Sequence, residues 1–119
     1  MTKSSHVILL CSDLMMTSSV SGVAAQVGRP FTAISGINDL NGCSDDDLIL
    51  IDLAMPGLNL EQAAGNLSNQ QKKNAVIYGP HVQKDRFEAA RAAGFLTVLP
   101  RGQFAANISE LVAHCSHGE

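Results

Sequence analysis

The chain alternates short apolar runs with segments in which apolar residues recur every three or four positions. Four continuous runs suit strands that are buried on both faces, at residues 7–11, 48–53, 75–78 and 95–99. Residues 31–34 form a weaker fifth candidate, because Pro30 lacks an N–H and favours a strand start or a sheet edge. The pattern predicts five strands.

Helical periodicity fills the intervals between these runs. Apolar stripes are expected over residues 16–27, 60–67, 87–93 and 104–115, with a short helix around residues 38–40. Gly28 and Gly94 follow two of the stripes, where glycine often ends a helix. Thr17 to Gly22 lacks the glycine of a phosphate loop directly behind the strand, so it is interpreted as ordinary helix.

Strand followed by helix, repeated five times, predicts an α/β fold: a three-layer doubly wound sheet of five parallel strands in one domain over residues 1–119. The composition is 45% apolar and 16% charged, which excludes a disordered chain. The net charge of −3 with scattered Lys and Arg argues against nucleic acid and membrane partners. Three cysteines without CxxC spacing favour a reduced, cytoplasmic setting over a disulfide framework or zinc site.

In such sheets a ligand site lies beyond the carboxyl ends of the strands. Four strand ends are therefore expected to meet, and they contribute Cys11-Ser12-Asp13, Asp52-Leu53-Ala54, Gly79-Pro80-His81 and Pro100-Arg101.

Four segments resemble the response-regulator receiver domain of the chemotaxis type. They are Leu50-Ile51-Asp52-Leu53-Ala54-Met55-Pro56-Gly57, Val76-Ile77-Tyr78-Gly79-Pro80-His81, Ala89-Ala90-Arg91-Ala92-Ala93-Gly94-Phe95 and Leu99-Pro100-Arg101-Gly102-Gln103-Phe104. Their order and spacing match the third strand, fourth strand, fourth helix and the Lys-Pro-x-Phe segment of that family. The resemblance implies a flavodoxin-like topology with strand order 2-1-3-4-5 and a role in two-component signalling or a phosphorelay.

By this resemblance Asp52 matches the phosphoacceptor, and the carbonyl of Ala54 matches a backbone ligand of Mg²⁺. The acidic pair that completes the magnesium site falls at Cys11 and Ser12, leaving Asp13 as the nearby acid. A thiol and a neutral hydroxyl are poor ligands for Mg²⁺. We therefore expect magnesium binding to be weak or absent, with Asp13 and Asp52 as weak candidate ligands.

Three further positions depart from the family pattern. The phosphate-binding hydroxyl residue is replaced by Gly79, the lysine by Arg101 and the aromatic switch residue by Val98. Arginine keeps the positive charge but changes its geometry. Together with the lost acidic pair, these replacements suggest a degenerate receiver, or pseudo-receiver.

Each candidate residue also has a structural interpretation. Asp52 is either a phosphoacceptor or a structural acid that pairs with Arg101 and accepts from loop amides, and Asp13 is either a weak metal ligand or a helix N-cap. His81 is a possible general base or an exposed loop residue. His114, His117 and Cys115 are interpreted as part of a C-terminal tail rather than a metal site.

The preferred hypothesis is a non-enzymatic interaction module that works without phosphorylation. Its expected surface is the fourth-helix face that receivers use, made of Lys84, Glu88, Arg91, Phe95 and Gln103. The expected partner is a histidine kinase, an output protein or a second copy in a homodimer. The alternatives are a working receiver that phosphorylates itself on Asp52 from a phosphodonor, and a flavodoxin-like binder of a small ligand.

Overall fold

Five parallel strands form one sheet in the order β2-β1-β3-β4-β5 in the computed structural model, which describes residues 6–42, 47–55, 58–80 and 84–114. The strands are β1 Val7–Leu10, β2 Phe31–Ile34, β3 Leu48–Asp52, β4 Val76–Gly79 and β5 Thr97–Pro100. The predicted class, strand number and strand order 2-1-3-4-5 are confirmed.

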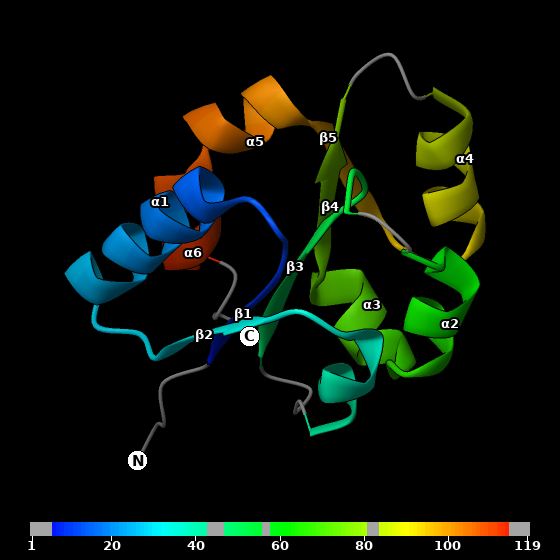
Figure 1. The fold of residues 1–119 in the computed structure, drawn as a ribbon, viewed down its shortest axis with the longest axis horizontal. Coiled ribbons are helices and arrows are strands. Elements are labelled where there is room, and N and C mark those ends of the chain that lie inside the picture. The colour runs from blue at the N-terminus through cyan, green and yellow to red at the C-terminus, as the bar shows by residue number, and fades with distance from the viewer. Residues whose placement is uncertain (1–5, 43–46, 56–57, 81–83, 115–119) are drawn as a thin grey trace.

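Helices cover both faces of the sheet. One face carries α1 Leu14–Gln26, α5 Arg101–Ala106 and α6 Ile108–His114, and the other carries α2 Leu60–Gly65, α3 Asn69–Asn74 and α4 Lys84–Ala92 (Figure 1). The 3₁₀ helix η1 Ile37–Gly42 lies where a short helix was predicted. Right-handed crossovers between parallel strands produce this three-layer arrangement.

The continuous apolar runs follow from burial of both faces of the central strands. In β1, Val7 and Leu9 pack toward α1, α5 and α6, whereas Ile8 and Leu10 pack toward η1, α2 and α4. Successive side chains of a strand point to opposite faces, so every residue of such a strand enters a core. Each fully buried Leu or Ile contributes about 1.5–3 kcal/mol of hydrophobic stabilisation.

The connections of α1 and α4 match the sequence signals. The Asp13 carboxylate caps α1 by accepting from the N–H groups of Met15 and Met16, which confirms its interpretation as an N-cap. Gly28 and Gly94 follow α1 and α4 with φ of +75° and +108°. These angles lie in the region that favours glycine. The segment from Thr17 to Gly22 lies inside α1, as predicted.

Two elements differ from the prediction. Helix α3 was missed, because its sequence Asn-Gln-Gln-Lys-Lys-Asn has no apolar period. The predicted helix over residues 104–115 is divided at Asn107, whose N–H bonds to the Phe104 carbonyl and whose side-chain amide donates to the Gln103 carbonyl at 2.8 Å. Asparagine competes with the helical backbone in this way, and the division is its result.

None of the helices in the described part of the chain is long and apolar enough to span a membrane.

Candidate functional site

Side chains from three neighbouring strands form a row at the carboxyl end of the sheet. Asp52 is opposite Tyr78 in the register of β3 and β4, and Cys11 follows the pair Leu10 and Ile51 in the register of β1 and β3. All three side chains point toward α1 and α5, because they occupy equivalent positions in the two-residue period of their strands. The topology thus brings Cys11, Asp52 and Tyr78 together.

The row is joined by hydrogen bonds. The Cys11 thiol donates to Oδ2 of Asp52 at 3.4 Å, and the Tyr78 hydroxyl donates to Cys11 Sγ at 3.2 Å. The Ala54 N–H donates to the other carboxylate oxygen of Asp52 at 2.9 Å. Asp52 is only 3% exposed, so its carboxylate is buried with both oxygens partnered. The prediction that Asp52 accepts a hydrogen bond from a loop amide is confirmed by the Ala54 N–H.

Burial keeps the thiol and the phenol protonated. It raises the pKa of Cys11, and the nearby Asp52 carboxylate raises it further. Burial likewise raises the pKa of Tyr78 far above its ordinary value, and the hydrogen bond to Cys11 adds to this effect. Cys11 therefore acts as a hydrogen-bond donor to Asp52 rather than as a thiolate.

Tyr78 also connects the row to α5. Its ring stacks on that of Phe104 with a centroid separation of 4.1 Å and an interplanar angle of 5°. Both rings are fully buried. The stack therefore fixes the phenol that donates to Cys11.

Arg101 pairs with Asp13 and not with Asp52, so the predicted Asp52–Arg101 pair is wrong. Arg101 is the first residue of α5, and its guanidinium forms an ion pair with the carboxylate that caps α1. The hydrogen bond from Arg101 lowers the pKa of Asp13, and the same bond raises the pKa of Arg101. Asp52 affects Arg101 only through its charge, since its own oxygens are engaged by Cys11 and Ala54.

The groups at this site that could face a cation are engaged with one another. Mg²⁺ requires near-octahedral oxygen ligands. The thiol of Cys11 stands at an acidic-pair position with a hydrogen bond to Asp52, and the Asp13 carboxylate is held by Arg101 and the start of α1. Across the described residues, no three His, Cys, Asp or Glu side chains are grouped so that they could hold a metal.

Gly79, at the end of β4, packs closely against Leu53. A Cβ at Gly79 would lie 2.8 Å from Cβ of Leu53, closer than real Cβ contacts come. A serine or threonine at position 79 requires a shift of the backbone. The packing against Leu53 therefore disfavours a hydroxyl residue at this position. Val98 is buried in the core under α4 with Phe87 and Phe95.

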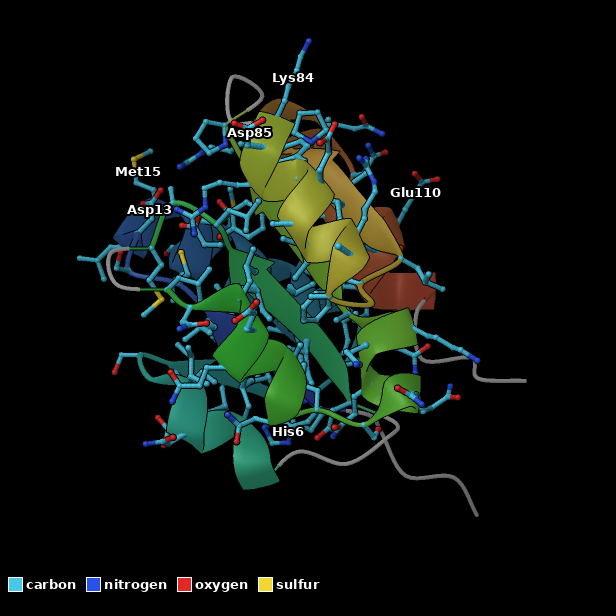
Figure 2. The ribbon with its side chains drawn as sticks, turned by 90° about the vertical axis from the view of Figure 1, so that its right-hand side faces the viewer. His6, Asp13, Met15, Lys84, Asp85 and Glu110 are labelled. Carbon is cyan, nitrogen blue, oxygen red and sulfur yellow. The ribbon has the colours of Figure 1, made fainter. Side chains whose placement is uncertain are left out.

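Four of the five residues expected to form the interaction surface are exposed. Lys84, Glu88 and Arg91 are exposed on α4, and Gln103 is exposed on α5; Figure 2 shows Lys84 and Asp85 at the start of α4. Phe95 is 0% exposed and does not belong to this surface. After the turn at Gly94 its N–H bonds to the Ala90 carbonyl, and its side chain enters the core between α4 and the sheet.

Some predicted positions lie outside the described residues. These are Pro56, Gly57, His81, Cys115 and His117, together with the side chain of His114. Ser12 is described and exposed.

The sequence analysis assigned no role at the site to Tyr78, Leu53 or Phe104. Tyr78 was treated as part of a buried strand, and Gly79, Pro80 and His81 were considered at its end. The two-residue period of a strand offered a signal for Tyr78. It places Tyr78 on the same face of β4 as Val76, whereas Gly79 faces the other side of the sheet. The register that aligns Tyr78 with Asp52 becomes visible only in the structure.

No family model matches the chain, and no curated protein matches it in sequence. Solved receiver structures do match its fold. A response regulator from Hahella chejuensis is 16% identical with a TM-score of 0.78, covering 98% of this chain and 100% of the other. A response regulator protein from Burkholderia multivorans is 22% identical with a TM-score of 0.73, covering 98% of each chain.

A third match is the receiver domain of the sensor histidine kinase PA1611 from Pseudomonas aeruginosa, with a magnesium ion coordinated in its active-site cleft. It is 14% identical with a TM-score of 0.70, covering 92% of this chain and 95% of the other. At these identities the likeness defines the fold. The chain has the α/β fold of response-regulator receiver domains, as the sequence resemblance implied.

Proposed function

We propose that this chain is an atypical receiver-like signalling domain of a two-component or related phosphorelay system, which acts as a protein-interaction module independently of phosphorylation. The observation that carries the proposal is the buried row of Cys11, Asp52 and Tyr78. Both carboxylate oxygens of Asp52 are already partnered inside the protein.

Phosphoryl transfer to a carboxylate needs groups that neutralise the charge developing on the phosphoryl oxygens. Receivers supply them with a metal ion, a hydroxyl residue and a lysine. In this chain the thiol of Cys11 replaces an acid, Gly79 has no room for a hydroxyl residue, and Arg101 is paired with Asp13. Each of these features removes part of the support for phosphoryl transfer, so the proposed domain is not an enzyme.

The proposed partner is another protein: a histidine kinase, an output protein or a second copy of this chain. The likeness to response regulators and to a receiver domain of a sensor histidine kinase supports this class of partner. Such systems work in the cytoplasm, where the three cysteines would stay reduced. The small-ligand alternative is disfavoured, because Thr17 to Gly22 form helix rather than a phosphate-binding loop.

The proposal is tested by incubating the protein with acetyl phosphate and Mg²⁺ and measuring its intact mass. We expect no phosphoryl adduct over a period in which a functional receiver, treated in parallel, is modified. Ser12→Asp, which adds an acid at an exposed position of the former pair, is expected to stay unmodified because Cys11 still bonds to Asp52. An adduct on the wild type that is absent from Asp52→Asn would show a working receiver and contradict the proposal.

A further inference from the structure

Most positive charges of the chain lie on α3 and α4, which cover one side of the sheet together with α2 (Figure 1). These two helices hold five of the eight Lys and Arg residues and two of the eleven Asp and Glu residues. Five positive and two negative side chains give them a net charge of +3, whereas the whole chain has −3. They are therefore basic helices within an acidic protein. Their positive residues are Lys72, Lys73, Lys84, Arg86 and Arg91.

Three of these cations lie where α3 and α4 end. Lys72 and Lys73 are in the last turn of α3, and Arg91 is in the last turn of α4. The Lys72 side chain joins the two ends, because its Nζ donates to the Ala93 carbonyl at 3.5 Å and lies next to Gly94. Lys73 and Arg91 are exposed. The C-terminal ends of the two helices thus form one positively charged surface.

The exposed cations of this surface are not neutralised by acids of the described residues. The ion pair in this part of the chain joins Arg101 to Asp13, and neither Lys73 nor Arg91 has an acidic partner there. Glu88 is one turn before Arg91 on α4 but forms no ion pair with it. Cations at a helix C-terminus interact favourably with the helix dipole. They also remain able to pair with carboxylates of another molecule.

A large apolar side chain is exposed beside these cations. Leu96 is 67% exposed and lies two residues after Gly94, the residue that Lys72 contacts. Its neighbour Phe95 is fully buried, so the chain turns Leu96 outward just before β5. A single exposed leucine is common on protein surfaces. Beside cations without acidic partners, it gives a partner both an apolar contact and a charge to pair with.

We propose that this surface, called the α3–α4 patch and made of Lys72, Lys73, Arg91 and Leu96, binds an acidic segment of another protein. Carboxylates of the segment face Lys73 and Arg91, and an apolar side chain of the segment packs on Leu96. The charge of the patch disfavours a basic partner, since like charges across an interface repel one another. The inference rests on the proposed function, because it gives the chemistry of the partner that the interaction module binds.

The surroundings of the patch favour a protein over a nucleic acid. Proteins that bind single strands stack bases on exposed aromatic rings. Phe87 and Phe95, the aromatic residues of α4 and of the turn that follows it, are buried and present no such ring. Asp85 and Glu88 are exposed on α4 and repel a phosphate backbone that follows the helix.

The patch overlaps the fourth-helix surface expected from the sequence at Arg91 alone. It extends onto α3 and to Leu96, whereas Lys84 lies at the opposite end of α4, as Figure 2 shows for Lys84 at the top of the view. Seven residues along a helix separate Lys84 from Arg91 by roughly 10 Å. This exceeds the screening length of about 8 Å at physiological salt. Variants at the two ends of α4 therefore distinguish the two surfaces.

The experiment is an amide NMR titration of the whole labelled chain at physiological salt, without Mg²⁺ or a phosphodonor. The probe is a short synthetic peptide in which glutamates flank one central leucine, and a second peptide carries alanine in place of that leucine. We expect saturable shifts at Lys73, Arg91 and Leu96 with the leucine peptide. The alanine peptide should bind several times more weakly, because it loses the contact with Leu96.

The protein variants remove one contact at a time. Lys73→Gln and Arg91→Gln should each raise the Kd about threefold to fivefold, the range for loss of one surface ion pair. Leu96→Ser should abolish the difference between the two peptides. Lys84→Gln is the matched control for Lys73→Gln, since it removes the same charge from an exposed lysine, and it should change the Kd less than twofold. Circular dichroism establishes that each variant is folded, and the peptide pair tests the patch without any variant.

Four results would overturn the inference. They are an unchanged spectrum with the leucine peptide at millimolar concentration, an equal loss of binding in Lys84→Gln and Lys73→Gln, tighter binding of a single-stranded oligonucleotide through the same residues, and shifts of the patch with protein concentration alone, which would assign it to a second copy. The proposed function fails by a different result, namely phosphorylation of Asp52 from acetyl phosphate. A protein that takes neither peptide nor phosphoryl group overturns this inference alone, and a phosphorylated protein that binds the peptide overturns the proposed function alone.

Discussion

At the scale of single residues, the site is governed by a thiol at the position where an acid is expected. Cys11 gives its hydrogen bond to Asp52 and receives one from Tyr78, so the buried carboxylate has a partner within the protein. Buried polar groups are stable when they are paired in this way. Because Cys11 and Tyr78 are titratable, the pH dependence of stability tests whether these hydrogen bonds exist in the native protein.

Stability should fall as the pH rises above about 9, the ordinary pKa of a thiol being 9.0 and that of tyrosine 10.0. The native pKa values of Cys11 and Tyr78 are raised, so both groups ionise in the unfolded chain while they stay neutral in the native one. The native state is therefore favoured below these values and loses that advantage above them. Urea unfolding at a series of alkaline pH values measures how steeply the free energy of unfolding falls with pH, which is called the alkaline slope below.

Tyr78→Phe keeps the ring that stacks on Phe104 and removes the titrating hydroxyl. The variant should lose part of the alkaline slope whatever its absolute stability. An unchanged slope would show that Tyr78 titrates normally in the native protein and would contradict the description of the row.

A second residue-scale prediction concerns Gly79. Gly79→Ser should destabilise the protein by about 1–3 kcal/mol, the usual cost of overpacking, because its Cβ meets Cβ of Leu53 and no rotation of the leucine can relieve that contact. Gly22→Ala is the matched control, since a Cβ there meets nothing within 4 Å in the exposed middle of α1. That variant should gain about 0.5–1 kcal/mol.

The comparison is made by urea unfolding of both variants. A Gly79→Ser protein as stable as the wild type would mean that the end of β4 does have room for a hydroxyl residue.

At the scale of elements, α3 shows how capping can define a helix without an apolar stripe. Ser68 accepts from the Gln71 N–H at 3.1 Å, and the Gln71 side chain accepts from the Ser68 N–H at 2.7 Å. This is a reciprocal capping box, in which two backbone donors are satisfied. Gln71 is buried, so the same residue also anchors α3 to the core.

Ser68→Ala should cost about 1 kcal/mol of unfolding free energy, because the N–H of Gln71 loses its acceptor. Ser68→Asp keeps an acceptor and should cost less. Ser18→Ala, on the exposed side of α1, provides the control for loss of a serine within a helix. Equal stability of Ser68→Ala and wild type in urea would contradict the importance of the box.

At the scale of the whole molecule, the sheet could be predicted because its strands are continuous apolar runs. Residues 7–10 and 48–52 have to be strands buried on both faces, and the alternation with helices fixes the doubly wound class. Strand ends then identified the region of Cys11, Asp52 and Arg101. The rule that ligand sites lie beyond the carboxyl ends of parallel strands predicts where the site is. It does not predict which side chains pair with one another there.

The pairings depended on geometry that no local pattern contains. The sequence places Arg101 after the same sheet edge as both Asp13 and Asp52, and only the structure shows that it pairs with Asp13. Phe95 looked like the start of a strand, but the turn at Gly94 directs it into the core. The Ser68–Gln71 capping signal was readable in the sequence, yet the absence of apolar residues within Asn69–Asn74 concealed α3.

The central claim is that Asp52 is held by its own protein and is closed to a phosphoryl group. Its most direct test is an amide NMR titration of labelled protein with Mg²⁺ and then with beryllofluoride, which mimics an aspartyl phosphate, using Asp52→Ala as the control. We predict that the signals of Asp13, Asp52, Gly79 and Arg101 do not shift. Saturable shifts at these residues that vanish in Asp52→Ala would show a working phosphorylation pocket and contradict the account.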